Sequence, residues 1–158
     1  MNIPSGFDKS SPVHWLAYGF GSGFAPRAPG TVGTVAALIL YVPLAQLPLL
    51  FYCLFVLLAS IAGIWICGRT SEQLGIHDPG GIVWDEFVGL WIALVAVPWG
   101  WIGILAAFIL FRLLDILKPW PIKWADQRVD GGLGIMLDDV LAGIMAALCL
   151  QAVNLVLT

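Results

Sequence analysis

Long apolar runs separated by short polar segments make up most of this chain. Residues 28–68 carry no Asp, Glu, Lys or Arg side chain, and neither do residues 87–111 or 140–158. A helix needs roughly 20 apolar residues to cross the hydrocarbon core of a bilayer. Inside that core each segment must satisfy its own backbone hydrogen bonds, which a helix achieves. The pattern therefore predicts an all-α protein whose helices span a membrane.

Proline, glycine and aromatic residues divide the first half of the chain. Residues 13–24 are aromatic and interrupted by glycines, which is typical of an interfacial segment lying on the membrane surface. Thr31 follows two prolines and is expected to cap a first span over about 32–46. A turn that starts near Pro43 separates it from a second span over about 49–67.

The third apolar run allows two topologies. As a single span over 87–111, it would split the seven Lys and Arg residues between the two sides of the membrane. As two short helices over about 82–97 and 101–117, broken at Pro98–Gly103, it places all seven on one side. Positive residues accumulate on the cytoplasmic side of membrane proteins. Five spans are therefore favoured, the last over about 139–157.

Composition supports a membrane protein and excludes some other classes. Hydrophobic residues make up 60% of the chain and charged residues only 11%, whereas soluble domains carry about a quarter charged residues. The three cysteines form no CxxC pair, so zinc is not indicated, and no basic face suggests nucleic acid. We expect one integral-membrane domain over residues 1–158. It would be a polytopic helical bundle of about five transmembrane helices, some short, plus the interfacial segment.

Acidic residues gather at the predicted cytoplasmic edge of these helices. The group has five members: Asp85, Glu86, Asp115, Asp138 and Asp139. Helix N-termini are expected at the same edge at Thr31, near Trp84 and near Asp138, and helix N-termini favour anions. Five carboxylates repel one another unless a cation lies among them. Mg²⁺ takes oxygen ligands and shares them with substrate phosphates, so we expect these five acids to hold Mg²⁺ beside a phosphate.

Several other side chains at this edge are candidates for binding the phosphate or for proton transfer. The candidates for binding are Arg27, Thr31, Arg112 and Lys118, and His14 is the candidate general acid. A simpler interpretation makes Arg112, Asp115 and Lys118 ion pairs on a helix surface, and makes Asp138–Asp139 a helix cap. Asp115, however, is flanked by apolar residues at membrane depth, where an ionisable side chain indicates function. Two further sets of residues need no function to explain them. Lys123, Asp126, Arg128 and Asp130 are interpreted as solvated loop charges, and Gly131, Gly132 and Gly134 as a flexible loop.

Four segments together resemble the bacterial phosphatidylglycerophosphatase A family. They are GFGSGFAPRAPGTVG (19–33), HDPGGIVWDEFVGLW (77–91), FRLLDILKPWPI (111–122) and GGLGIMLDDVLAG (131–143). The resemblance implies a Mg²⁺-dependent phosphatase of the bacterial inner membrane. It implies removal of the terminal phosphate from phosphatidylglycerophosphate to give phosphatidylglycerol. With the multi-pass topology favoured above, the active site would face the cytoplasm. The expected partner is this anionic phospholipid; no nucleic acid is expected, and no protein partner is implied.

The chemistry and one alternative function remain open at this stage. The expected catalytic residues are Asp85, Glu86, Asp115, Asp139 and His14. A carboxylate would either deprotonate an attacking water or attack phosphorus itself, and the sequence does not distinguish these routes. The alternative is a small ion transporter or membrane scaffold, in which the carboxylates would carry ions. Clustering of the acids at one membrane edge, not at mid-membrane, argues against that function.

Overall fold

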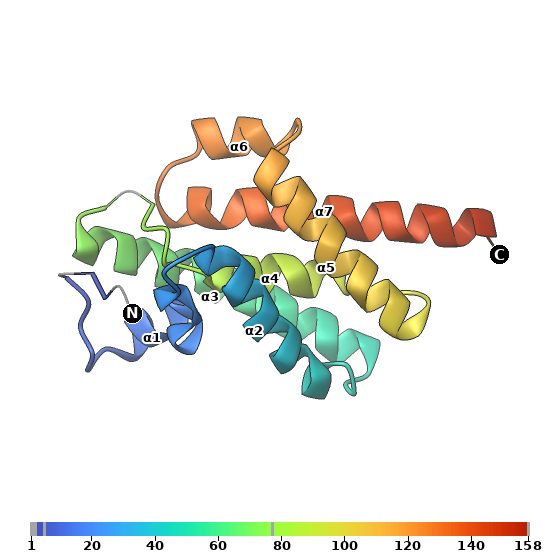
Figure 1. Cartoon of the computed structure of the whole chain (residues 1–158), viewed down its shortest axis with the longest axis horizontal. Coiled ribbons are helices and arrows are strands. Elements are labelled where there is room, and N and C mark those ends of the chain that lie inside the picture. The colour runs from blue at the N-terminus through green and yellow to red at the C-terminus, as the bar shows by residue number, and fades with distance from the viewer. Residues whose placement is uncertain (1–2, 5, 77, 158) are drawn as a thin grey trace.

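The computed structural model describes residues 3–4, 6–76 and 78–157. All regular secondary structure within these residues is helical. In chain order the elements are α1 (Pro12–Ala17), η1 (Gly19–Phe24), α2 (Pro29–Leu44), α3 (Leu49–Leu74), α4 (Trp84–Ala93), α5 (Gly100–Leu117), α6 (Ile122–Arg128) and α7 (Gly131–Leu157). Figure 1 shows this arrangement, with α7 running along the length of the molecule. The predicted all-α class is confirmed.

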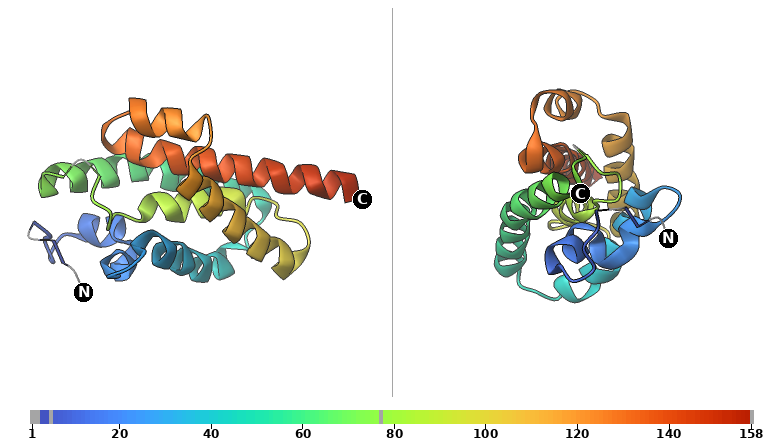
Figure 2. Two further views of the ribbon diagram at one scale, coloured as in Figure 1. Left: turned by 45° about the horizontal axis from the view of Figure 1, so that its top comes forward. Right: turned by 90° about the vertical axis from the view of Figure 1, so that its left-hand side faces the viewer.

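Five helices, α2, α3, α4, α5 and α7, run from one end of the molecule toward the other, α2 and α5 obliquely, and α4 lies in the middle (Figures 1 and 2). We call these five the lengthwise helices. Helix α4 packs against all four of the others. The short elements α1, η1 and α6 lie at the end where α4 begins, whereas the α2–α3 and α4–α5 connections lie at the opposite end. We call these the site end and the far end. All seven basic residues lie in or next to the ends of elements at the site end: Lys9, Arg27, Arg69, Arg112, Lys118, Lys123 and Arg128.

Only some of the lengthwise helices are long enough to cross a bilayer unaided. By length and composition α3, α5 and α7 qualify, and α2 is an apolar helix of 16 residues. The central helix α4 has 10 residues, about 15 Å at 1.5 Å per residue. It is shorter than the expected helix over 82–97. Ala96 and Trp99 have positive φ, so the chain turns before α5 begins, as the break at Pro98–Gly103 predicts.

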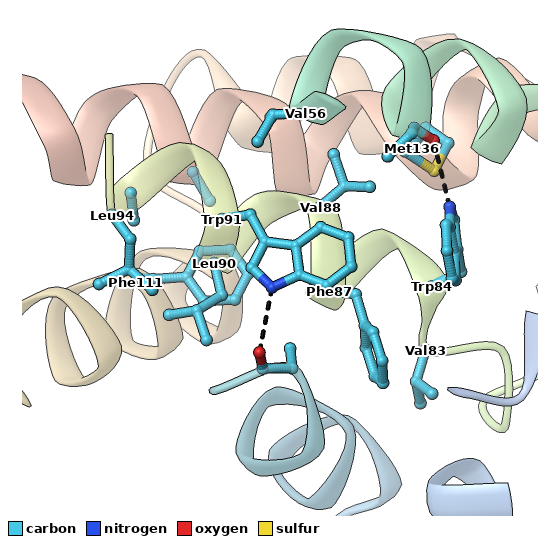
Figure 3. Close-up of a cluster of buried hydrophobic side chains, with 14 of the residues drawn as sticks. Val56, Val83, Trp84, Phe87, Val88, Leu90, Trp91, Leu94, Phe111 and Met136 are labelled. Atoms are coloured by element: carbon cyan, nitrogen blue, oxygen red, sulfur yellow. Dashed lines mark hydrogen bonds between the residues drawn. The ribbon is translucent and has the colours of Figure 1, made fainter. Parts of the chain in front are cut away.

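Burial on every side explains why so short a helix is stable. Eight of the ten α4 residues are buried, so its neighbours shield it from lipid. The Trp91 indole N–H donates to the Ala37 carbonyl at 3.0 Å, and that of Trp84 donates to the Ala59 carbonyl at 3.2 Å (Figure 3). A buried indole N–H needs such a partner. These two bonds attach α4 to α2 and α3.

Two glycines bring α4 and α7 into close contact. A Cβ added to Gly143 of α7 would lie 2.3 Å from the Gly89 carbonyl oxygen. A Cβ added to Gly89 would lie 2.8 Å from the Asp139 carbonyl oxygen. Residues four apart lie on one helix face, so Asp85 precedes Gly89, and Asp139 precedes Gly143, by one turn on the facing surfaces. The glycine contact therefore brings these two carboxylates together.

Two predicted helix starts are wrong. Helix α2 begins at Pro29, not after Thr31, because proline at the first position has its φ already set for a helix. Helix α7 begins at Gly131, so the expected flexible glycine loop is helical and Asp138 lies about two turns inside the helix. Packing compensates for the poor helix propensity of glycine, since a Cβ on Gly132 would lie 1.9 Å from the Ile64 carbonyl oxygen of α3.

Two further differences concern the site end. Helix α3 continues to Leu74, about two turns beyond the predicted end of the second span. Tyr18, expected at the membrane surface, is buried and stacks on Phe24. The interfacial segment is thus a packed cap: α1 contacts α3, and η1 contacts α2. This cap closes the site end on one side.

Candidate active site

Three carboxylates from two helices meet at the site end. Asp85 and Glu86 belong to the first turn of α4, and Asp139 comes from α7. One oxygen of each lies within 4.8 Å of the others. Asp139 is only 3% exposed. Buried carboxylates this close repel one another unless a cation separates them, and oxygen ligands suit Mg²⁺. We call these three residues the carboxylate cluster.

Several buried polar atoms in and beside the cluster have no hydrogen-bond partner among the described residues. They are Glu86 Oε2, Asp138 Oδ1, Asp139 Oδ1 and Arg112 Nε. Leaving a buried polar atom unpaired costs about 1–3 kcal/mol, and more where it is charged. Native proteins keep few such atoms, and each needs an explanation. A bound cation for the oxygens and a bound anion for the guanidinium would provide one.

Arg112 connects α5 to the carboxylate cluster. Its guanidinium Nη1 donates to Asp115 Oδ2 at 2.6 Å, one turn along the same helix, and lies 3.8 Å from Glu86 Oε1. The expected ion pair between Arg112 and Asp115 is therefore present. It does not exclude a role in the site, because the same guanidinium reaches the cluster. Asp115 is not one of the three cluster residues, but its carboxylate pairs with Arg112 and also lies beside that of Asp139.

Lys118 also joins two acidic side chains. It caps the C-terminus of α5, and its ammonium group donates to Asp138 Oδ2 at 2.7 Å and to Asp126 Oδ1 of α6. Burial alone would lower the pKa of Lys118, but these two hydrogen bonds outweigh burial and raise that pKa above its usual value. The amine therefore stays protonated. Asp126 is exposed, as expected for a solvated charge, but it belongs to helix α6 and not to a loop, and α6 brings it to Lys118.

A polar cavity of about 140 Å³ lies beside the cluster. Its wall includes four carboxylates and two apolar side chains: Asp78, Asp85, Asp126, Asp138, Val129 and Ile135. A water molecule occupies about 30 Å³ in the liquid, so the cavity has room for several waters or for a small polar group. It shares Asp85 with the carboxylate cluster, and a ligand in it would therefore be next to the cluster.

The N-terminus of α2 forms another wall. A Cβ on Gly30 would lie 2.1 Å from Glu86 Oε1 and 3.1 Å from an Arg112 guanidinium nitrogen. Only glycine fits there without displacing Glu86, a requirement that the sequence analysis missed. The expectation of helix N-termini at this end holds for α2, α4 and α7, although α7 begins at Gly131, about two turns before the predicted start near Asp138. Thr31 follows Gly30 and is partly exposed, and Arg27 is exposed in the preceding loop.

His14 belongs to the packed cap and not to the cluster. It is 1% exposed. Its Nδ1 accepts a hydrogen bond from the Asp8 backbone N–H at 2.9 Å, and its Nε2 lies 2.7 Å from Gln73 Oε1. An Nδ1 acceptor requires Nε2 to carry the proton and to donate it to Gln73. Both ring nitrogens are thus engaged, so the structure does not support His14 as the general acid.

The fold and this site define a polytopic membrane protein with a buried acidic centre flanked by two cations. Residues 15–154 match the family model for phosphatidylglycerophosphatase A. The chain is 48% identical over 141 residues to phosphatidylglycerophosphatase A of Escherichia coli (strain K12), which covers 87% of this chain and 81% of that protein. The chain therefore belongs to the phosphatidylglycerophosphatase A family, and it is a phosphatase.

Two further relatives match a similar extent of the chain. Phosphatidylglycerophosphatase A of Haemophilus influenzae (strain ATCC 51907 / DSM 11121 / KW20 / Rd) is 48% identical over 148 residues, covering 91% of this chain and 90% of that protein. A protein of Bacteroides thetaiotaomicron named putative phosphatidylinositol-3-phosphatase is 44% identical over 139 residues, covering 82% and 85%. No solved structure matches the chain.

Proposed function

We propose that the protein hydrolyses the terminal phosphate monoester of phosphatidylglycerophosphate, with Mg²⁺, to give phosphatidylglycerol and phosphate. The reaction would take place at the cytoplasmic face of the bacterial inner membrane. The observation that carries the proposal is the buried cluster of Asp85, Glu86 and Asp139 beside Arg112 and Lys118. The names of the two 48% identical relatives support the choice of lipid.

The carboxylate cluster fits a magnesium ion. Its three residues offer hard oxygen ligands within 4.8 Å of one another, and Glu86 and Asp139 each keep a buried oxygen that no described residue satisfies. Asp85, Glu86 and Asp139 would hold the ion directly. Asp115 and Asp138, expected as further ligands, pair with Arg112 and Lys118. Bound there, Mg²⁺ would neutralise the phosphate and polarise a phosphoryl oxygen.

The two cations are placed to stabilise charge on the phosphate. Lys118 has three N–H donors and commits two of them to Asp126 and Asp138, so one is left for a phosphate oxygen. Arg112 Nε is a buried donor without a partner among the described residues. Donors fixed in advance where charge develops are an effective source of catalysis. Arg27 and Thr31, beside the α2 N-terminus, complete the proposed phosphate contacts.

A carboxylate of the cluster would supply the nucleophilic step. It would either take the proton of an attacking water or attack phosphorus itself to form an aspartyl or glutamyl phosphate. Acid quenching during a single turnover distinguishes the two. Direct attack by water leaves no phosphorylated enzyme, whereas the covalent route allows an aspartyl or glutamyl phosphate to be trapped.

The apolar face of α5 suits a lipid substrate. Ile102, Leu105, Ile109, Leu113 and Ile116 are large and exposed, and they follow the helical spacing of three to four residues. Acyl chains lying along this face would bring the headgroup to Arg112. All seven basic residues lie at the site end, which the positive-inside rule assigns to the cytoplasm. Reporter fusions at Gly100 and at the C-terminus should then both report the outside.

Phosphate release by purified protein in detergent tests this function. We expect release from phosphatidylglycerophosphate with Mg²⁺, loss of release with EDTA and recovery on adding Mg²⁺ back, because the cluster carboxylates need the cation. Phosphatidic acid is the control lipid and should release little. Equal release with EDTA would overturn the metal assignment, and equal release from phosphatidic acid would overturn the assignment of the lipid.

A further inference from the structure

The site contains two cationic bridges of the same design. Arg112 joins Glu86, inside the carboxylate cluster, to Asp115 outside it. Lys118 joins Asp138, the neighbour of the cluster residue Asp139, to Asp126 outside it. In each bridge the outer carboxylate balances the cation and limits its movement. Asp115 is therefore the outer carboxylate paired with Arg112, and Asp126 is the outer carboxylate paired with Lys118.

Packing holds the helix that carries Asp126 in place. Asp126 belongs to α6, a helix of seven residues that packs on α7. Ile122 and Ala125 are fully buried, whereas the side chain of Asp126, the next residue, is exposed and held by Lys118. The opposite face of α6 is open, with Trp124 exposed. The short helix thus delivers one carboxylate to the Lys118 amine from a rigid support.

Asp138 is the group that this arrangement orients. Its Oδ2 accepts from Lys118 at 2.7 Å, whereas its buried Oδ1 has no hydrogen-bond partner in the described part of the chain. Asp138 and Asp126 both line the cavity beside the cluster. A lysine ammonium on a flexible stem has many rotamers, and one carboxylate partner leaves it able to swing. Two partners on different helices restrict its position.

We propose that Asp126 is a positioning residue: it holds the Lys118 ammonium group on Asp138, and so fixes both at the cavity wall. This inference rests on the proposed function and adds a residue to it. Asp126 acts through Lys118 and makes no contact with the lipid. Its loss should therefore lower kcat and leave KM for phosphatidylglycerophosphate within about twofold. Removing a direct charge-stabilising donor costs about 10²–10³-fold in kcat, so we expect a smaller loss of about tenfold for a residue one step removed.

The test is a double-mutant cycle on the full-length protein with Asp126→Asn, Lys118→Met and the double variant. If Asp126 acts through Lys118, Asp126→Asn lowers kcat about tenfold in the wild-type background and has no further effect when Lys118 is already Met. Residues that act as a unit show this non-additivity. Asp126→Glu, which keeps the charge, should recover part of the loss. Glu72→Gln, which removes an exposed carboxylate from the same end of α3, is the matched control and should leave kcat unchanged.

Thermal unfolding of each variant separates positioning from folding. Wild-type kcat for Asp126→Asn, additive losses in the cycle, or a raised KM would each overturn the proposal, the last by showing that Asp126 contacts the lipid. A lowered melting temperature with normal kcat would show that Asp126 has only a structural role. Absence of phosphate release from the wild-type protein would instead contradict the proposed function, so the two failures are distinguishable.

Discussion

The two ends of the bundle treat buried polar groups in opposite ways. At the far end, the buried Tyr52 hydroxyl donates to the Trp91 carbonyl at 2.7 Å. At the site end, three carboxylates and one guanidinium keep buried atoms unpaired among the described residues. At the far end, polar groups hydrogen-bond helices to one another. At the site end, buried polar atoms stay free of protein partners among the described residues and are available to a ligand, which lowers the stability of the protein.

Replacing a cluster carboxylate gives the largest expected effect and the sharpest test of this comparison. Asp139→Asn and Glu86→Gln should each lower phosphate release by on the order of 10³-fold or more, because each removes a ligand and a charge at the reacting phosphate. Neither should lower the melting temperature, since an unpaired buried charge is itself costly. Activity and thermal unfolding of the same preparations measure both. Near-normal release by both variants would contradict the metal-site assignment.

A methyl group at the α2 N-terminus should have the next largest effect. The Cβ of Gly30→Ala would lie 2.1 Å from Glu86 Oε1, so Glu86 must move. Misplacing a catalytic group by about 1 Å can cost about 10²-fold, and we expect a loss of 10–100-fold in kcat. Gly80→Ala is the matched control, because nothing lies within 4 Å of its added Cβ. Equal kcat for the two variants would show that Glu86 tolerates displacement.

At the far end the expected effect is small and confined to stability. Tyr52→Phe removes the hydrogen bond to the Trp91 carbonyl and should lower the free energy of unfolding by about 1–3 kcal/mol. Phosphate release should not change. Tyr41→Phe removes a neighbouring hydroxyl while keeping the ring contact between the two tyrosines, and serves as the control. Loss of release in Tyr52→Phe would show that the two ends are coupled.

The sequence predicts much of the site because charged residues are scarce in this chain. Each acid in an otherwise apolar protein is conspicuous, and the carboxylate cluster was among the five acids singled out. Asp126 was not, because a carboxylate in a polar segment with several other charges has no distinguishing pattern. Gly30 was missed for another reason: its importance lies in the distance to Glu86, which only the packing of α2 on α4 reveals.

The helix boundaries, too, could be predicted only in part from the sequence. Apolar runs and prolines correctly predicted the turn after Pro98 and the number of lengthwise helices. They failed at Gly131–Gly134, where weak helix propensity suggests a loop but close packing against α3 stabilises a helix. They also overestimated the length of α4, which is stable at 10 residues because four neighbouring helices bury it.

The all-α class, the family and the segregation of charge to one end follow from composition and from motifs along the chain. Which carboxylates meet, the link from Lys118 to Asp126 and Asp138, and the place of His14 in the packed cap depend on how the helices pack. These are distances between segments far apart in sequence. They depend on how closely helices approach, and glycine contacts such as that of Gly89 with Gly143 set that approach.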